Sequence, residues 1–325
     1  MSGPAPARRS PSTSGRRVVA VGGGHGLSAS LRALRRVTDD VTAVVGVSDD
    51  GGSSGRLRRE FGVVPPGDLR MALAALCGDD SWGGTWSRVV QHRFTGDGEL
   101  GGHSLGNLLI TALWEETGDI VTGLDWVGAL LGAHGRVLPV ATEPLQIVAD
   151  VAGLHADDAR AVTRVTGQVE VATTTGEVLG LHLEPSTVRA CPEAVSAILG
   201  AEAIVLGPGS WFTSVLAPML VPDVADAVAR SAGRVVVVLN LSEQIGETSG
   251  FSPQRHLEVL HELFPRLRVH TVLADPRRVP DVAALTSAAT ALGARVMLAP
   301  VASPDGSAVH DVDQLASAFR GVLRR

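Results

Sequence analysis

The sequence contains no lysine and no tyrosine, and only two of its 325 residues are cysteine. Arginine therefore supplies every basic side chain, so a Schiff-base lysine and a phosphate-loop lysine are both excluded. Cys77 and Cys191 are too few for a disulfide scaffold or a cysteine zinc site, and we expect each to be a small buried hydrophobe. Charged residues make up 19% of the chain and its net charge is −6, so the composition does not favour binding to nucleic acid.

Long hydrophobic runs are also missing, because no uninterrupted apolar stretch approaches the roughly 18 residues that a membrane span needs. Residues 1–16 read MSGPAPARRSPSTSGR and lack the hydrophobic region of a signal peptide. We interpret them as a disordered tail, since they are rich in Pro, Ser and Arg. These features predict a soluble protein of the cytoplasm with no membrane span.

Short β-branched runs alternate with amphipathic stretches along most of the chain. Apolar strands that are continuous rather than alternating indicate a parallel sheet covered on both faces. The expected strands are 18–21, 41–47, 203–206, 235–241, 269–273 and 295–298, and the expected helices are 27–36, 192–199, 223–232, 253–263 and 279–292. Residues 72–131 are mostly helical in pattern, whereas 148–185 alternate in places like antiparallel hairpin strands. We predict a single α/β domain over 17–325, with an insertion at about 72–190.

The first expected strand ends in a loop with the sequence GGGHG, residues 22–26. Without Cβ atoms, the backbone can turn tightly and approach a ligand closely. The helix that follows presents unpaired N–H groups and the positive end of its dipole, which suit a phosphate. The spacing differs from the dinucleotide pattern G-x-G-x-x-G, because Leu27 stands where the third glycine would be. We expect this loop to contact a ligand.

A second polar segment, SDDGGSSGRLRREFGVVPPGDLR, covers residues 48–70 and is interpreted as a long loop. Asp49 and Asp50 occupy the place where a Rossmann protein holds a ribose hydroxyl, and they could instead bind magnesium or form a solvated acidic turn. Ser53 and Ser54 add hydroxyl groups to the glycines around them.

The same segment contains two arginines and a second helix start. Asp68 would suit the N-cap of that helix. Arg56 and Arg70 could each bind a phosphate through two parallel hydrogen bonds. Loops this rich in donors seldom serve only as connectors.

A third loop follows the expected strand at 203–206. Gly207-Pro208-Gly209-Ser210 leads into a helix that contains Thr213 and Ser214. This repeats the pattern of the first loop at another strand end, and two such loops indicate a ligand with a diphosphate or two phosphorylated ligands.

The segment GGHSLGNLL matches the hydrolase pattern G-x-S-x-G, but a nucleophile elbow needs a buried strand immediately before it. The preceding residues, RFTGDGELG, are polar and rich in glycine. We therefore place Ser104 at a helix start and expect His103, Ser104 and Asn107 to contact a ligand rather than form a catalytic triad. Arg35 and Arg36 are interpreted as part of a solvated face.

Six motifs follow one another along the chain: VVAVGGGHGLSASLRAL, SDDGGSSGRLRREFGVVPPGDLR, GHSLGNLL, GRVLPVATEP, IVLGPGSWFTS and LNLSEQIGETSGFS. Together they resemble the gluconeogenesis-factor family (YvcK-like), bacterial cytoplasmic proteins related in fold to 2-phospho-L-lactate transferase (CofD). The resemblance spans about residues 17–325. His25 stands where many members have threonine, which indicates the actinobacterial branch, as does the GC-rich composition.

The resemblance implies a CofD-like fold: a Rossmann-like, doubly wound, mostly parallel sheet with helical and small antiparallel β insertions. It also implies a role in growth on gluconeogenic carbon sources and in cell-wall and cell-shape morphogenesis. The implied ligand is a UDP-sugar, either UDP-N-acetylglucosamine or UDP-glucose. Asp50 is the candidate magnesium ligand. With His25 from the glycine loop, the expected binding residues are Gly23, Gly24, His25, Gly26, Asp49, Asp50, Ser53, Ser54, Arg56, Asp68, Arg70, His103, Ser104, Asn107, Gly207, Gly209, Ser210, Thr213 and Asn240.

Three functional hypotheses remain open. The leading one is a regulatory nucleotide-sugar-binding protein that forms a homo-oligomer and acts on cell-envelope regulatory proteins, with segments 48–70 and 242–251 as its moving parts. The second is a magnesium-dependent phospho-acyl transferase of the CofD type, although GHSLGN and the segment after VLP follow the gluconeogenesis branch. The third is a dinucleotide-dependent oxidoreductase, which only the first glycine loop and the acids after the second strand favour.

Overall fold

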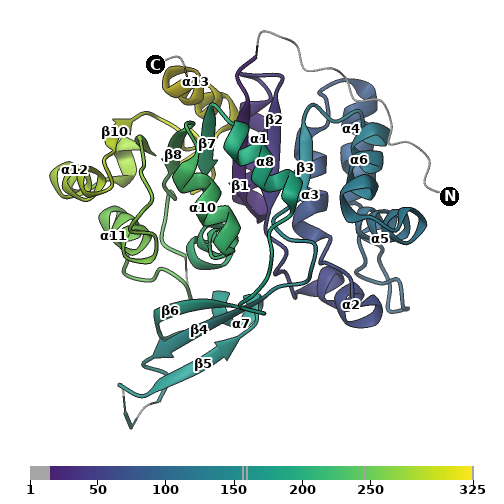
Figure 1. The fold of residues 1–325 in the computed structure, drawn as a ribbon, viewed down its shortest axis with the longest axis horizontal. Helices are drawn as coiled ribbons and strands as arrows, with labels where there is room; N and C mark the ends of the chain where they lie inside the picture. The colour runs from purple at the N-terminus through teal and green to yellow at the C-terminus, as the bar shows by residue number, and fades with distance from the viewer. Residues whose placement is uncertain (1–14, 156, 159, 245, 324–325) are drawn as a thin grey trace.

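The computed structural model describes residues 15–155, 157–158, 160–244 and 246–323 (Figure 1). Residues 1–14 of the predicted tail lie outside this part. A seven-stranded sheet forms the centre of the molecule, with all neighbouring strands parallel and the order β10-β9-β8-β7-β1-β2-β3. Its strands are β1 (Val18–Gly22), β2 (Val41–Val45), β3 (Arg136–Pro139), β7 (Ala203–Leu206), β8 (Arg234–Val238), β9 (Thr271–Ala274) and β10 (Arg295–Leu298).

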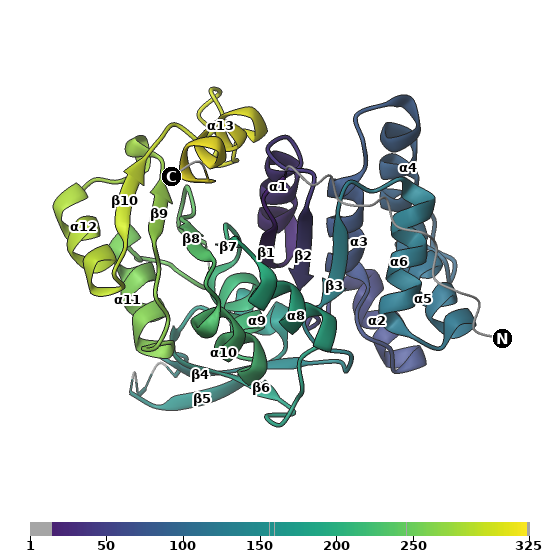
Figure 2. The same cartoon turned by 45° about the horizontal axis from the view of Figure 1, so that its top comes forward.

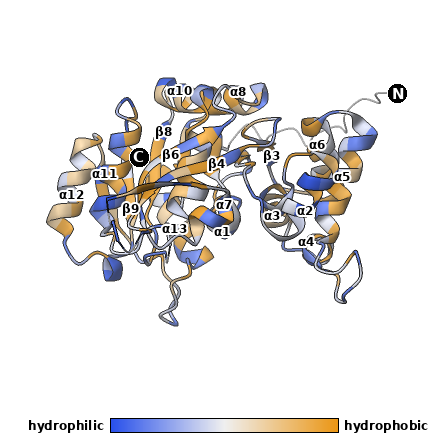
Figure 3. Cartoon of the chain, turned by 90° about the horizontal axis from the view of Figure 1, so that it is seen from below, coloured by the Kyte–Doolittle hydropathy of each residue, from blue (hydrophilic) through white to orange (hydrophobic). Residues whose placement is uncertain are grey.

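Helices cover both faces of this sheet. Figure 3 shows α8 and α10 on one side and α1, α3 and α13 on the other, with hydrophobic strands between them. Leu27, Leu31 and Leu34 recur at helical spacing on α1 and are at most 2% exposed, so α1 buries that face. The helices are α1 (Gly24–Leu34), α2 (Gly52–Phe61), α3 (Gly67–Leu76), α4 (Ser81–Gln91), α5 (Leu105–Thr117), α6 (Ile120–Leu131), α7 (Gln168–Ala172), α8 (Pro192–Gly200), the π-helix η1 (Trp211–Leu216), α9 (Ala217–Met219), α10 (Pro222–Arg230), α11 (Pro253–Leu263), the 3₁₀-helix η2 (Pro276–Arg278), α12 (Val282–Ala291) and α13 (Val312–Leu323).

A second, smaller sheet projects from the main body (Figures 1 and 2). Its strands are antiparallel in the order β5-β4-β6, with α7 between β5 and β6 in the sequence. The bounds are β4 (Gln146–Ala152), β5 (Val162–Thr166) and β6 (Glu177–Glu184). We call β4, β5 and β6 the projecting sheet. Its antiparallel pairing agrees with the alternation seen in residues 148–185.

The predicted doubly wound α/β fold is confirmed. The predicted strands at 203–206 and 295–298 and the helix at 253–263 agree with the structure to the residue. The prediction of one long loop over 48–70 is wrong, because α2 and α3 occupy most of it. α2 begins with GSSG, whose low helix propensity hides it in the sequence. β3 was not predicted either, because it ends in proline, which is uncommon within a sheet.

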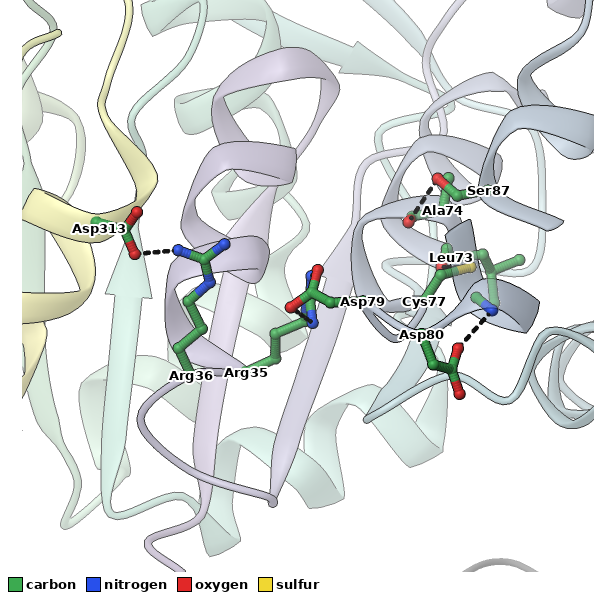
Figure 4. A network of polar contacts seen from close by, with 10 residues as sticks. Arg35, Arg36, Leu73, Ala74, Cys77, Asp79, Asp80, Ser87 and Asp313 are labelled. Carbon is green, nitrogen blue, oxygen red and sulfur yellow. Dashed lines mark hydrogen bonds and ion pairs between the residues drawn. The ribbon is translucent and has the colours of Figure 1, made fainter. Parts of the chain in front are cut away.

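Arg35 and Arg36 do not lie on a merely solvated face (Figure 4). Arg35 forms an ion pair with Asp79 in the α3–α4 connection, and its own side chain is only 11% exposed. This contact lowers the pKa of Asp79. Arg36 pairs with Asp313 of α13. The carboxyl end of α1 therefore forms ion pairs with the α3–α4 connection and with α13. The prediction that Arg35 and Arg36 belong to a solvated face is corrected accordingly.

Both cysteines are buried free thiols, as predicted, and burial raises the pKa of each to about 11. Among the described residues, no single helix is long and apolar enough to cross a membrane, whereas the bent pair 211–219 and 222–230 meets that test by length and composition when taken together.

Candidate functional site

The main sheet has a topological switch point at β1, from which the chain winds outward in opposite directions. In open parallel sheets, ligands bind beyond the carboxyl ends of the strands at such a point. The loops after β1 and β7 touch there, because a Cβ added to Gly26 would overlap the carbonyl oxygen of Pro208. Ser30 Oγ of α1 also donates a 3.0 Å hydrogen bond to the carbonyl of Gly207. The topology thus brings the first and third predicted loops together.

The first glycine loop presents open backbone at this junction. Gly24 has a φ of +61°, and the atom nearest to a Cβ added there is Ser214 Oγ, 3.9 Å away. Gly23 has no such room, since an added Cβ would overlap Asp68 Oδ2. His25 is exposed in the first turn of α1. A ligand phosphate at the start of α1 would meet the positive end of the helix dipole.

Asp68 lies in the first turn of α3, whose N-cap is Pro66, so the prediction that Asp68 caps this helix is wrong. Its carboxylate instead accepts a hydrogen bond from the backbone N–H of Gly24. Burial, followed by the negative charge of Asp49, raises the pKa of Asp68 to about 7, against the opposing effects of the Gly24 N–H and Arg70. A carboxyl group that titrates near neutrality therefore faces the first glycine loop.

Asp49 lies beside Asp68 at the carboxyl end of β2. Its Oδ1 accepts the N–H of Gly51 at 3.0 Å, and its Oδ2 would be 2.6 Å from a Cβ added to Gly67. That added Cβ would also overlap Ser54 Oγ, so carboxylate and hydroxyl oxygens gather at the start of α3. Magnesium prefers such oxygen donors and completes its shell with phosphates and water. Within the described part of the chain, no group of three or more His, Cys, Asp or Glu residues is placed to hold a metal.

Asp50 points toward the projecting sheet. Its carboxylate accepts hydrogen bonds from the backbone N–H groups of Gln168, at 2.9 Å, and Val169, at 3.1 Å. A Cβ on Gly167 would come within 2.5 Å of Asp50 Oδ2, and Gly167 has a φ of +111°. The acids of the DD pair thus have different partners, and a magnesium ligand role fits the surroundings of Asp49 better than those of Asp50.

Ser53 connects the second predicted loop with the GHSLGN motif. Its Oγ accepts hydrogen bonds from the Ser104 N–H at 3.3 Å and from Asn107 Nδ2 at 3.1 Å, and lies 3.0 Å from His103 Nδ1. With both acceptor positions used, the Ser53 hydroxyl donates to His103 Nδ1. Burial lowers the pKa of His103, in agreement with a neutral ring that accepts this bond.

Ser104 is the N-cap of α5, which confirms its predicted place at a helix start. Its side chain is fully buried and donates a 2.9 Å hydrogen bond to the carbonyl of Val90. A fully buried hydroxyl that donates to a backbone carbonyl is not placed to attack a substrate. The arrangement supports the interpretation against a catalytic triad.

The predicted arginines bind protein groups. Arg70 is buried and donates from Nε to Asn107 Oδ1 at 2.9 Å and from Nη1 to Gln91 Oε1 at 2.5 Å; burial lowers its pKa to about 10. Arg56 donates to the carbonyl oxygens of Glu99 and Gly101. The charge of Arg70 also lowers the pKa of Asp68, so this arginine lies near the carboxyl group that faces the first glycine loop.

Arg58 is a site residue that the sequence analysis missed. It donates a 2.7 Å hydrogen bond to the carbonyl of Leu145 and is half-buried. Burial lowers its pKa, while the charges of Asp50 and Asp49 act in the opposite direction, which places a guanidinium near both acids. Had residues 52–61 been recognised as a helix, Arg58 would have fallen on the same face as Ser54.

The third loop already has an anion at its helix start. Glu247 accepts hydrogen bonds from the N–H groups of Phe212, at 2.8 Å, and Thr213, at 3.4 Å, and from the Thr213 hydroxyl. Burial raises the pKa of Glu247. The N–H of Trp211 donates to Gln244 Oε1 at 2.9 Å. The donors that the sequence analysis assigned to a phosphate therefore bind the chain's own side chains.

Asn240, at the end of β8, holds the third loop in place. Its Oδ1 accepts the Gly209 N–H at 3.0 Å and its Nδ2 donates to the Gly209 carbonyl at 2.8 Å. Gln244 Nε2 donates to Ser210 Oγ at 3.1 Å. The predicted residues of the third loop thus lie together, beside its contact with the first loop. A hollow of about 310 Å³ lies at the amino ends of β1, β2 and β3, lined by Arg17, Asp40 and other residues outside the predicted site.

Comparison with known proteins agrees with this architecture. The family described as 2-phospho-L-lactate transferase CofD matches residues 18–299. A Mycobacterium tuberculosis protein named "Putative gluconeogenesis factor" is 51% identical over 95% of this chain and 90% of its own length. The "Gluconeogenesis factor" of Listeria monocytogenes is 34% identical over 94% of this chain and 95% of its own.

A solved structure supports the same conclusion. A UPF0052 family protein from Bacillus halodurans superposes with a TM-score of 0.83 at 31% identity, covering 95% of this chain and 99% of that one. The resemblance seen in the sequence motifs is therefore confirmed in both sequence and fold. The chain belongs to the CofD family, in the branch that contains the gluconeogenesis factors of actinobacteria.

Proposed function

We propose that this protein is a cytoplasmic regulator that binds a UDP-sugar at the switch point of its main sheet. The observation that most supports this is the junction of the first and third loops, where Gly24 leaves open backbone at the start of α1. The names of the relatives favour a role in growth on gluconeogenic carbon sources. Control of cell-wall and cell-shape morphogenesis, through cell-envelope regulatory proteins and as a homo-oligomer, belongs to the same proposal.

We propose that the diphosphate of the ligand binds at the first glycine loop and not at the third. The reason is that Glu247 and Gln244 already bind the N–H groups at the start of η1. Magnesium would be held by Asp49 and Asp68 together with phosphate oxygens and water, and would supply positive charge between the carboxylates and the diphosphate. Because the pKa of Asp68 is raised to about 7, binding of the cation should release a proton near neutral pH.

Calorimetry with UDP-N-acetylglucosamine, UDP-glucose, UDP and uridine tests the proposal. We expect the two UDP-sugars and UDP to bind more tightly with magnesium present, and uridine to bind weakly in either case. The UDP-sugar should also be recovered chemically unchanged after long incubation. Binding of GDP or NAD in place of every uridine ligand would contradict the proposal.

A magnesium-dependent phospho-acyl transferase is the second candidate, because the Asp49–Asp68 pair would suit a metal-assisted phosphoryl transfer. In that reaction an acceptor hydroxyl attacks the phosphorus, its proton leaves, and the nucleoside monophosphate departs. Release of a nucleoside monophosphate by the wild-type protein and its loss in Asp68→Asn would favour the transferase over the regulator.

A further inference from the structure

The short helix α7 lies between the candidate site and the projecting sheet (Figure 1). Its amino end is bound by Asp50, through the N–H groups of Gln168 and Val169. Val169 also packs against the second predicted loop, where its Cγ2 would be 3.2 Å from a Cβ added to Gly51. One end of α7 therefore contacts the segment that follows β2.

The other end of α7 contacts the segment that follows β8. A Cβ added to Gly246 would overlap the carbonyl oxygen of Ala172, and Gly246 has a φ of +97°. The next residue is Glu247, which binds the start of η1. α7 also packs directly on η1. The helix thus contacts the segments that follow β2 and β8, and the π-helix η1 that follows the third loop.

α7 is at the same time built into the projecting sheet. β5 ends at Thr166, and the N–H of Gly167, one residue later, donates a 2.8 Å hydrogen bond to the carbonyl of Ile147 in β4. Val171 is fully buried against the core. A displacement of α7 must therefore be accommodated by β4 and β5.

The outer part of the projecting sheet has few buried side chains. The side chains of β5 alternate between exposed and half-buried, and Val162 in β5 and Leu179 in β6 are 57% and 55% exposed. Segments with few buried contacts open at low free-energy cost. A small shift at the buried end of α7 can accordingly change the exchange behaviour of the whole sheet.

We propose that α7 couples the ligand site to the projecting sheet, so that binding at the site changes the state of β4, β5 and β6. This inference rests on the proposed function. The charge of the ligand, or its magnesium, would alter the position of the Asp49–Asp50 segment and therefore of α7. The ligand then binds two conformations of the protein, which differ in the position of α7, with different affinities. Such a difference in affinity is the requirement for a population shift. By linkage, anything that holds the projecting sheet in one position changes ligand affinity by the same factor.

The test removes a hydrogen bond between α7 and Asp50 without substituting any of the predicted binding residues. Gln168→Pro removes one N–H that donates to Asp50, and proline is tolerated at the first position of a helix. Gln168→Ala is the matched control, because it removes the side chain and keeps that N–H. Val169→Pro, in the same first turn, is the second variant in case Gln168→Pro does not fold. Calorimetry with UDP-N-acetylglucosamine and hydrogen exchange of residues 146–184 are measured on each protein.

We expect the ligand to slow exchange in β4, β5 and β6 of the wild type and of Gln168→Ala by about fivefold or more, within the usual range of coupling factors. In Gln168→Pro, ligand should still bind while this slowing is lost. Ligand binding by the wild type with unchanged exchange in the sheet, or a full response in both proline variants, would overturn the coupling alone. Failure of every uridine nucleotide to bind would instead overturn the proposed function, and the coupling with it.

Discussion

Two glycines of the first loop, Gly24 and Gly26, stand two residues apart and are required for different reasons. A side chain on Gly26 would meet the backbone of the neighbouring loop, including the Cα of Gly209 at 2.6 Å, and backbone atoms cannot rotate away. Gly24 has space around it and a positive φ. Gly26 serves the packing of the junction, and Gly24 leaves room for a ligand.

Gly26→Ala should therefore lower the free energy of unfolding by about 1–3 kcal/mol, as other overpacked sites do. Gly24→Ala should cost about 1 kcal/mol for its left-handed backbone and, in addition, weaken UDP binding. Urea unfolding and calorimetry on both variants measure the two effects. If Gly26→Ala unfolds like the wild type, the close contact between the loops is wrong.

Asp68 makes a prediction about pH. Its folded pKa, about 7, lies above the ordinary value of 3.8, so the folded state keeps a proton that the unfolded state has lost between these values. Its contribution to stability is full below pH 4 and falls as pH rises to about 7. Asp68→Asn should be more stable than the wild type at pH 8, by about 1.4 kcal/mol for each pKa unit of the shift, and equal to it at low pH. Thermal unfolding without magnesium measures this, and equal stability of the two proteins at pH 8 would argue against it.

At the scale of the elements, the main strands and several helices could be predicted because each follows from a local apolar pattern. α2 could not, since Gly51 and the sequence GSSG favour a loop, and the helix depends on contacts far along the chain. Arg56 and Arg58 reach Gly101 and Leu145 in those contacts. Where the local preference between helix and loop is weak, such tertiary contacts determine which one forms. They cannot be recognised in a single sequence.

η1 shows the same limit at the site. The glycine-rich turn before it correctly predicted a helix start whose N–H groups need a partner outside the helix, but not that Glu247, more than 30 residues later, would bind them. The partner of a helix start depends on which distant segment folds over it. The glycine-rich turn therefore predicts that an anion binds there, but not whether this anion is a ligand or a side chain of the same protein.

Glu247→Ala should lower the free energy of unfolding by about 2–4 kcal/mol, because it leaves the buried donors of Phe212 and Thr213 without their acceptor. Glu247→Gln keeps one acceptor oxygen and should cost less. Chemical denaturation of both variants compares them. An alanine variant as stable as the wild type would show that the carboxylate does not stabilise η1.

At the scale of the whole molecule, the strand order determines where the loops meet. Because β1 has β2 on one side and β7 on the other, sequence segments nearly 200 residues apart adjoin at its carboxyl end. The convergence of the three loops could be predicted from the rule for parallel sheets. The internal bonds of Arg56, Arg70 and Asp50 could not, since residue type alone does not tell a ligand contact from a structural one.

The central claim is that a nucleotide diphosphate binds at the first glycine loop, at the switch point between β1 and β7. A crystal structure with UDP-N-acetylglucosamine and magnesium tests it most directly. We expect the diphosphate against the backbone of Gly24 at the start of α1, the cation between Asp49 and Asp68, and Glu247 still bound to η1. If the diphosphate instead lies on the N–H groups of η1 in place of Glu247, or in the hollow at the amino ends of β1, β2 and β3, the proposed site is wrong.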